Sequence, residues 1–217
     1  MCGIVGYVGR SQAAPIILDG LSRLEYRGYD SAGMAIYDGE KINITKSVGR
    51  LKVLSELTHD GQTMPGQLGI GHTRWATHGA PSNLNAHPHV NEKETIAVVH
   101  NGIIENYQQL KKKLEGRGYH FLSETDTEVL AHMLDYYYKG DPIEAITKVL
   151  HRVEGSYALG ILFSDYPEEL FAVRKDSPLI VGQNQDGCFI ASDVPAILRY
   201  TRTVTYVENQ EIVRLSA

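Results

Sequence analysis

The chain opens with the stretch Met1-Cys2-Gly3-Ile4-Val5-Gly6-Tyr7-Val8-Gly9. Its apolar residues follow one another without the alternation of a half-exposed strand, which predicts a strand buried within the fold. A cysteine stands at the start of this strand, directly behind the initiator methionine. A strand holds its first residue in place, whereas a frayed chain end would not. The stretch therefore predicts a fold organised around its first strand, with Cys2 fixed at one end of it.

Cys2 has two interpretations. Aminopeptidases remove Met1 when the next side chain is small, and this would leave a thiol and a free α-amine on one residue. An ordinary thiol has a pKa of about 8.5 and an α-amine a pKa near 8, so the amine could serve as a base for the thiol. One residue would then supply nucleophile and base, as in N-terminal-threonine hydrolases. The alternative is that a cysteine at position 2 is an accident of the start site.

The composition limits the class of protein. The 217 residues carry a formal net charge of −5, the sequence pI is near 6.0, and no basic patch indicates a nucleic-acid partner. No apolar run approaches the ~20 residues of a membrane-spanning helix, so no membrane partner is expected. Cys2 and Cys188 are the two cysteines, which argues against a disulfide framework and favours a cytoplasmic location. We expect one domain over residues 1–217, because no linker or internal repeat interrupts the chain.

Strands are expected first, helices in the middle and strands again at the end. This order argues against alternating βαβ units and indicates an α+β fold of two mainly antiparallel sheets covered by helices. The expected helices are residues 12–27 behind an N-cap at Ser11, then 50–57, 106–115, 125–139, 142–152 and 194–198. After the first strand, the expected strands are residues 32–37, a return strand to about 47, 68–72, 95–99, 156–164, 170–174, 179–181, 188–191, and two near 204 and 213.

Two stretches combine glycines with charged and aromatic residues where an element ends. Residues 24–33 read LEYRGYDSAG; a left-handed helix C-cap would account for Gly28 but leaves Arg27 and Asp30 unexplained. Residues 71–79 read GHTRWATHG, where Arg74 offers the planar fork that grips a carboxylate through two hydrogen bonds. An ordinary surface loop around a packed Trp75 is the alternative for the second stretch.

Two further stretches end in groups that could bind a reacting amide substrate. A buried strand is expected to end at Asn101-Gly102, whose side-chain amide and backbone N–H could form an oxyanion hole; a plain Asn-Gly turn is the simpler interpretation. Residues 123–126 read Ser-Glu-Thr-Asp. Thr125 or Asp126 is expected to cap the next helix, and the Asp126 carboxylate could also accept a substrate ammonium.

Histidines are concentrated between positions 72 and 100, including the run His87-Pro88-His89. A metal site has to be considered for such a cluster. The spacing lacks the i, i+4 helical pair with a neighbouring acid, and no cysteine pair joins it. No functional metal is therefore expected.

Taken together, these stretches make the chain resemble class II glutamine amidotransferase domains, which are N-terminal-nucleophile hydrolases. The motifs that carry the resemblance follow one another in the family's order and read CGIVGYVG, LEYRGYDSAG, GHTRWATHG, NAHPH, VVHNGIIEN and SETDTEV. The second and third look most like the glutaminase domains of glutamine–fructose-6-phosphate aminotransferases. The resemblance covers essentially the whole chain and implies a four-layer αββα sandwich.

The resemblance also implies roles for particular residues. Cys2 would attack the side-chain amide of L-glutamine to give a thioester and ammonia, with its α-amine moving the proton through a water. Asn101 and Gly102 match the family's oxyanion hole, and Arg27 lies in the motif that supports the nucleophile. The substrate-binding positions would be Arg74 for the α-carboxylate, Thr77 and His78 beside it, Asp126 for the α-ammonium, and Trp75 in the loop over the bound glutamine.

The resemblance implies no cofactor and no metal. In the full-length synthase an isomerase domain, absent from this chain, would use the ammonia to make glucosamine 6-phosphate from fructose 6-phosphate, and that enzyme is expected to be a homo-oligomer. Two alternatives stay open at this point. One is an N-terminal-nucleophile hydrolase for another amide, and the other is a catalytically silent regulatory, interaction or metal-binding domain.

Overall fold

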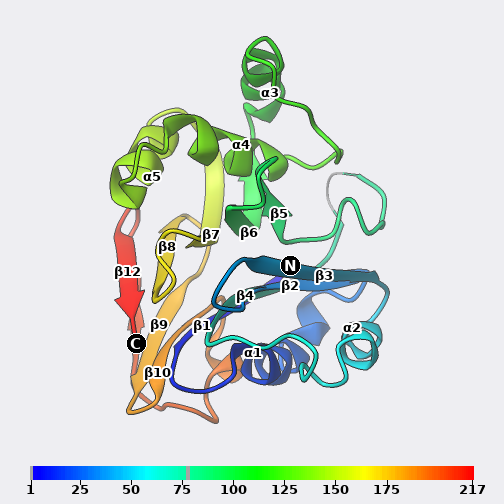
Figure 1. Cartoon of the computed structure of the whole chain (residues 1–217), viewed down its shortest axis with the longest axis vertical. Coiled ribbons are helices and arrows are strands. Elements are labelled where there is room, and N and C mark those ends of the chain that lie inside the picture. The colour runs from blue at the N-terminus through cyan, green and yellow to red at the C-terminus, as the bar shows by residue number, and fades with distance from the viewer. Residues whose placement is uncertain (1, 77–78) are drawn as a thin grey trace.

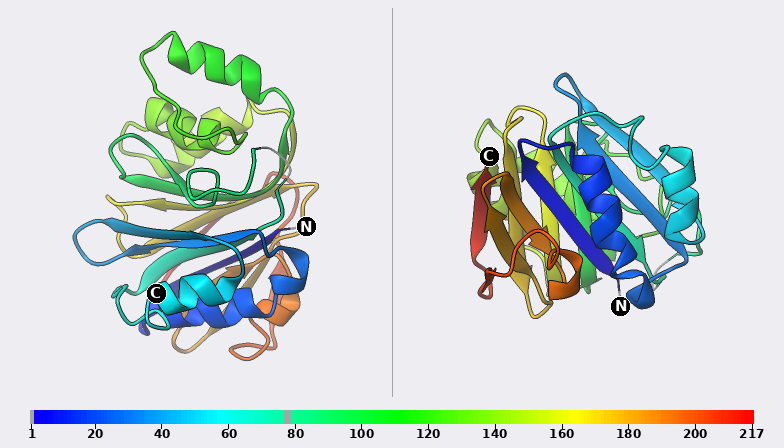
Figure 2. Two further views of the ribbon diagram at one scale, coloured as in Figure 1. Left: turned by 90° about the vertical axis from the view of Figure 1, so that its right-hand side faces the viewer. Right: turned by 90° about the horizontal axis from the view of Figure 1, so that it is seen from below.

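Two antiparallel β-sheets lie face to face in the computed structural model, which describes residues 2–76 and 79–217 (Figure 1). Helices cover the outer face of each sheet, so the order of layers is helix, sheet, sheet, helix. Figure 2 shows these four layers edge-on, with the N-terminal end of the first strand at one end of the stack. The four-layer αββα sandwich expected from the sequence is confirmed.

The larger sheet has the strand order β11-β9-β10-β1-β4-β2-β3. Its centre is β1 (Gly3–Gly9), which pairs with β10 (Gly187–Ala191) on one side and with β4 (Leu68–Arg74) on the other. The remaining strands are β2 (Ser31–Tyr37), β3 (Ile42–Val48), β9 (Ile180–Asn184) and β11 (Val204–Tyr206).

The smaller sheet has the strand order β12-β8-β7-β6-β5. Its longest strands, β6 (Ile96–Ile104) and β7 (Gly155–Phe163), pair along their full length. The others are β5 (His89–Val90), β8 (Glu169–Lys175) and β12 (Ile212–Ser216). The short β5 was not expected from the sequence.

Five α-helices occur in the described part of the chain, and none of its helices is both long and apolar enough to cross a membrane. Two of them, α1 (Ala13–Ser22) and α2 (Leu51–Leu57), pack on the larger sheet. Three cover the smaller sheet: α3 (Tyr107–Glu115), α4 (Glu128–Tyr137) and α5 (Pro142–Leu150). Short 3₁₀ turns occupy Glu25–Arg27 and Val194–Ala196.

β1 is buried on both faces, which explains its unbroken apolar sequence. Ile4 and Val8 belong to the core between the two sheets, whereas Val5 and Tyr7 belong to the core beneath α1. Successive side chains of a strand point to opposite faces, so a strand between two apolar layers must be apolar at nearly every position. The buried first strand predicted from the sequence is thus confirmed, and it is the centre of the larger sheet.

Several expected element ends were wrong. Ser11 caps no helix: α1 begins at Ala13 behind Gln12 and ends at Ser22, after which the chain tightens into the 3₁₀ turn. β6 continues past Asn101 to Ile104, because β7 lies alongside and pairs with it as far as Gly155. α4 begins at Glu128 and not at Thr125 or Asp126, since the side chains of residues 125–127 hydrogen-bond to other segments.

Gly28 has an extended backbone, with φ −169° and ψ 133°, so the predicted left-handed C-cap was wrong. The physical reason for a glycine here is the close approach of another strand. A Cβ at this position would lie 2.7 Å from the carbonyl carbon of Arg74 and 2.9 Å from its oxygen. Gly28 therefore lets the 3₁₀ segment lie directly against the end of β4.

We expect Gly28→Ala to lower the free energy of unfolding by about 1–3 kcal/mol, the usual cost of overpacking against atoms that cannot move away. Gly116→Ala is the matched control. Gly116 has a helical backbone, and an added Cβ there would meet its nearest atom at an ordinary 3.5 Å, so this variant should be neutral or slightly stabilising. Urea unfolding of both variants measures the difference, and equal midpoints would contradict the packing argument.

Candidate active site

A cavity of about 320 Å³ opens at the end of the sheet stack where β1 begins. The register Gly3↔Thr73 places the first residue of β1 beside the last residues of β4, while β6 approaches from the other sheet. The residues lining the cavity are Cys2, Arg27, Arg74, Trp75, His87, His100, Asn101, Gly102, Ile103, Thr125, Asp126, Thr127, Ser156, Ser177 and Pro178. Among the site residues predicted from sequence, Thr77 and His78 lie outside the described residues; the other seven all line this cavity.

Cys2 lies half-buried against the backbone of Trp75. The Trp75 N–H donates to the Cys2 sulfur at 3.2 Å, and the thiol faces the Trp75 carbonyl at 3.6 Å. Burial raises the pKa of the Cys2 thiol, although the Trp75 N–H and the nearby Arg74 charge act in the opposite direction. A thiol with a raised pKa is protonated at neutral pH, so reaction at this sulfur requires a base.

Asn101 and Gly102 lie within β6 and form the wall opposite Cys2. The Asn101 side-chain amide donates from Nδ2 to the Cys2 carbonyl at 3.1 Å. Gly102 has φ +126°, and a Cβ there would collide with the carbonyl oxygen of Ser156 on β7. The Asn-Gly pair is therefore not a hairpin turn. It is a distortion inside a long strand that only glycine accommodates, and it brings the amide of Asn101 next to the thiol residue.

Arg74 is the last residue of β4 and only 4 % exposed. Its Nη2 donates to the carbonyl of Gly79 at 3.0 Å. Trp75, which also lines the cavity, has 48 % of its surface exposed, and its ring meets that of Tyr29 edge-on at 5.3 Å. The cavity thus has a buried cation in its wall and a pair of aromatic rings at its rim.

Asp126 supplies the carboxylate of the cavity from the segment that leads into α4. One of its oxygens accepts a hydrogen bond from the backbone N–H of Ile104 at 2.8 Å. Asp126 lies two residues before the helix, so the expectation that it opens the helix was wrong. Its position is set by the end of β6.

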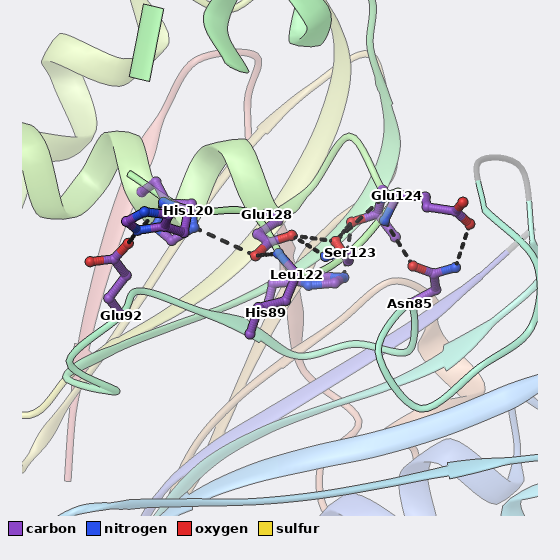
Figure 3. Close-up of polar contacts among 10 residues, drawn as sticks. Asn85, His89, Glu92, His120, Leu122, Ser123, Glu124 and Glu128 are labelled. Atoms are coloured by element: carbon purple, nitrogen blue, oxygen red, sulfur yellow. Dashed lines mark hydrogen bonds and ion pairs between the residues drawn. The ribbon is translucent and has the colours of Figure 1, made fainter. Parts of the chain in front are cut away.

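Glu128 holds the segment that carries Asp126. Its carboxylate accepts from the N–H groups of Leu122 and Ser123 at 2.8 and 2.7 Å, and from the Ser123 hydroxyl at 2.6 Å (Figure 3). Burial alone would raise the pKa of Glu128, yet hydrogen bonds from His132, Leu122 and Ser123 lower it to about 2. Glu128 lies three residues after Thr125, the spacing of a capping box, but its carboxylate accepts from the N–H groups of Leu122 and Ser123, which precede Thr125.

The same segment is fixed from outside by Asn85. This side chain donates to the Glu124 carboxylate at 3.2 Å and accepts from the Glu124 N–H at 2.9 Å (Figure 3). Thr125 contacts the His89 ring at 3.1 Å, and Thr127 contacts the His100 ring at 2.9 Å. These contacts could not be predicted from the sequence, although the NAHPH, VVHNGIIEN and SETDTEV motifs contain the residues that make them.

Arg27 and Asp30, which the sequence left unexplained, hold the walls of the cavity. Arg27 is buried and donates to the Ser192 carbonyl at 3.4 Å and to the Asp193 carboxylate at 3.0 Å. Ser192 in turn pairs with Ile4 on β1. Asp30 accepts from the Ala76 N–H, and its own N–H donates to the carbonyl of Arg74. Arg27 thus ties the cavity to the start of β1, and Asp30 shapes the chain after β4.

The histidine cluster is buried, and its rings contact protein groups. Four of its members lie close together: His87 and His100 line the cavity, and His72 and His89 lie behind them. Within residues 2–76 and 79–217, no group of three or more His, Cys, Asp or Glu side chains has the arrangement to hold a metal ion. Burial lowers the pKa of His72 to about 3 and the pKa of His87 well below its ordinary value, so these imidazoles are neutral at pH 7.

Known proteins are similar to this chain in sequence. The chain is 61% identical over 212 residues to the glutamine–fructose-6-phosphate aminotransferase (isomerizing) of Caldanaerobacter subterraneus, covering 98% of the chain and 35% of the relative. It is 58% identical over 217 residues to the enzyme of the same name from Clostridium acetobutylicum, covering the whole chain and 36% of that relative. The chain thus spans about a third of the length of these curated relatives.

Solved structures give the same result for the fold. The glutamine phosphoribosylpyrophosphate amidotransferase of B. subtilis, solved with ADP and GMP, matches 99% of the chain at 29% identity with a TM-score of 0.86, and the match covers 47% of that protein. A glutamine aminotransferase class-II domain protein from Silicibacter pomeroyi matches the whole chain at 16% identity with a TM-score of 0.68, covering 95% of that protein. The N-terminal-nucleophile type of sandwich expected from the sequence is thereby confirmed.

A sequence model described as a glutamine amidotransferase domain matches residues 72–199, more than half of the chain. This span contains Arg74, Asn101, Gly102 and Asp126. The chain belongs to the glutamine amidotransferase domain family, class II.

Proposed function

We propose that this chain hydrolyses the side-chain amide of L-glutamine to glutamate and ammonia, with Cys2 as the nucleophile. The observation that carries the proposal is the convergence of four groups in one cavity. The Cys2 thiol, the Asn101 amide, the Arg74 guanidinium and the Asp126 carboxylate line a space of about 320 Å³, at the small end of the range for small-molecule sites.

The proposed reaction has two covalent steps. The Cys2 sulfur attacks the side-chain amide carbon of glutamine, and the Asn101 amide and the Gly102 N–H stabilise the negative oxygen of the tetrahedral intermediate. Collapse breaks the C–N bond and leaves a thioester. Water then attacks the thioester carbon, releasing glutamate and restoring the thiol.

A base must take the thiol proton, because burial raises the pKa of Cys2. The α-amine that removal of Met1 would expose is the base we propose, acting through a water. It accepts the proton as the sulfur attacks, and it delivers that proton to the departing nitrogen so that ammonia leaves neutral. The mechanism uses no metal or cofactor.

Recognition of the free amino acid is assigned to the charged wall of the cavity. Arg74 would bind the α-carboxylate through its planar fork, and Asp126 would accept from the α-ammonium with the oxygen that does not hold Ile104. We propose that Trp75 closes over the bound glutamine, that Thr77 and His78 contact its carboxylate end, and that Arg27 supports the nucleophile through its contact with Ser192.

The names of the relatives extend the proposal beyond hydrolysis. Those enzymes are aminotransferases for fructose 6-phosphate, and about two thirds of their length lies outside the match. We propose that ammonia made here serves glucosamine 6-phosphate synthesis by an isomerase domain in a homo-oligomeric, cytoplasmic enzyme. The chain by itself should form no aminosugar.

Blocking the α-amine tests the proposed base. Insertion of a glutamate between Met1 and Cys2 prevents removal of Met1, because the second side chain is then large, while the thiol is kept. We expect glutamate release from glutamine to be lost in this variant and in Cys2→Ala. Because burial raises the thiol pKa, alkylation of Cys2 by iodoacetamide in the extended variant should still increase as the pH rises from about 7 to about 9.

Cys188→Ala is the matched control for these measurements. Cys188 is buried and its thiol faces the carbonyl of Ser216, so this variant should keep full activity and the same single alkylation, read by intact mass. A normal rate in the extended variant would show that the α-amine is not the base. Alkylation at Cys188 in place of Cys2 would sink the nucleophile assignment.

Asp126→Asn separates the charge of Asp126 from its structural hydrogen bond. The asparagine carbonyl can still accept from the Ile104 N–H, so the segment stays in place, but the charge for an ammonium is gone. Removal of one partner of a desolvated charge pair costs about 2–5 kcal/mol, so kcat/KM for glutamine should fall well over tenfold. The wild type should strongly prefer glutamine to N-acetylglutamine, and the variant should lose that preference.

Arg74→Lys is the companion variant for the other charge. It keeps the positive charge and loses the fork, so glutamine binding should weaken while glutamine amide, which lacks the carboxylate, should be affected little. Similar turnover of glutamine and N-acetylglutamine by the wild type would mean that Asp126 only braces β6. If asparagine were the preferred substrate, the chain would be a hydrolase for a different amide.

A further inference from the structure

The buried histidines of this cluster, two of which line the cavity, have no role in the proposed mechanism. The rings of His72 and His87 stack with 4.1 Å between their centroids and 13° between their planes, and His89 meets His87 edge-on at 4.8 Å. His72 comes from β4 of the larger sheet, and His100 from β6 of the smaller one. These rings therefore form a polar contact between two sheets whose shared core consists mainly of apolar side chains.

The contacts of His72 determine which of its nitrogens carries the proton. Its Nε2 lies 3.0 Å from the carbonyl oxygen of His100 and 3.0 Å from Oδ1 of Asn101. A backbone carbonyl can only accept, so Nε2 must carry hydrogen and donate. A neutral imidazole carries one N–H, which leaves Nδ1 unprotonated; that atom has no hydrogen-bond partner among the described residues.

This donor fixes the orientation of the Asn101 amide. The atom that faces a donating Nε2–H has to be the oxygen, so the NH₂ group points the other way, to the Cys2 carbonyl at 3.1 Å. A flipped amide would set its NH₂ against the His72 N–H and its oxygen against the Cys2 carbonyl. Both contacts would be repulsive in a buried site, where an unmade hydrogen bond is costly.

His87 fixes the backbone on the other side. The His100 N–H donates to Nδ1 of His87 at 3.3 Å, which leaves the proton of His87 on Nε2, facing the Thr127 hydroxyl at 3.4 Å. Thr127 is then free to donate its own hydrogen to Nδ1 of His100 at 2.9 Å. The strand residue before Asn101 and the residue after Asp126 are thus held by one set of neutral rings.

We propose that His72 is a positioning residue that locks the side-chain amide of Asn101 with its NH₂ group toward Cys2. The role rests on the proposed function, because it matters for catalysis only if Asn101 stabilises an oxyanion. His72 itself does not touch the substrate cavity; it acts through Asn101.

A double-mutant cycle tests whether the effect passes through Asn101. Asn101→Ala should lower kcat for glutamine by roughly 10²–10³, as for loss of one oxyanion donor, with less change in KM. His72→Phe leaves the amide free to turn and should lower kcat by roughly tenfold to a hundredfold. If His72 acts only through Asn101, the double variant should match Asn101→Ala alone.

Two further variants separate positioning from damage to the core. In His72→Gln the side-chain NH₂ can donate to both carbonyls, so most of the wild-type kcat should return. Val149→Ala truncates a buried side chain of α5 in the core between the helices and the smaller sheet, away from Asn101, and should lower the thermal midpoint without lowering kcat. The proposal would be overturned if the kcat losses of the two single variants multiplied in the double variant, or if His72→Phe kept the wild-type kcat.

A measurement on the wild-type chain needs neither activity nor a folded variant. Long-range ¹H–¹⁵N correlation spectra distinguish the two neutral tautomers of a histidine ring. His72 should be protonated on Nε2 at pH 7, and a proton on Nδ1 would overturn the proposal even if every variant failed to fold. If the wild type hydrolysed no glutamine, the proposed function would fail, while this spectrum would still decide whether His72 orients Asn101.

Discussion

The burial of β1 on both faces is the constraint on which the rest of the structure depends. One face of the strand contributes Ile4 and Val8 to the core between the sheets, and the other contributes Val5 and Tyr7 to the core beneath α1. Moving the strand out of either core would expose apolar surface to water, which costs roughly 25 cal/mol of free energy for each Å². The position of the strand's first residue is consequently fixed as firmly as that of its middle. Cys2, which directly precedes the strand, is fixed with it.

Both sheets contribute residues to the cavity, so the width of the cavity depends on how the two sheets pack against each other. β1 and β4 bring Cys2 and Arg74 from the larger sheet, and β6 brings Asn101 from the smaller one. Gly28 and Gly102 mark two places around this cavity where one backbone lies directly against another. The side chains of Arg27, Asp30 and Glu128 then hydrogen-bond to the connecting segments, so that loops and strand ends together form the wall of the cavity.

The fold class could be predicted from the sequence because each layer leaves a local pattern. The apolar run of β1, the Asp38-Gly39 turn between β2 and β3, and the Asp141-Pro142 cap of α5 are all readable from neighbouring residues. Element ends that depend on distant partners were not readable. β6 extends through Asn101 only because β7 lies beside it, and α4 starts late because Asp126 binds the N–H of Ile104.

The same distinction applies to the site. Motifs identified the residues, and seven of them line one cavity, but their contacts could not be predicted. Asn101 meets Cys2 across 99 positions of sequence, and His72 meets Asn101 across 29. The tautomer of a histidine depends on such partners, so it cannot be predicted from the sequence. Thr77 and His78 stay predictions, as they lie outside the described residues.

The neutral state of the buried rings has a thermodynamic consequence in acid. The pKa of His72 in the fold is about 3, and burial also holds the pKa of His87 well below its ordinary value. Below a pH of about 6.5, these side chains become protonated in the unfolded chain, whereas burial keeps them neutral in the folded chain. Unfolding is therefore coupled to proton uptake, and the stability that these rings contribute at neutral pH declines as the pH falls from about 6.5 toward 3. The imidazoles of this cluster therefore become available for protonation only when the protein unfolds and the two sheets separate.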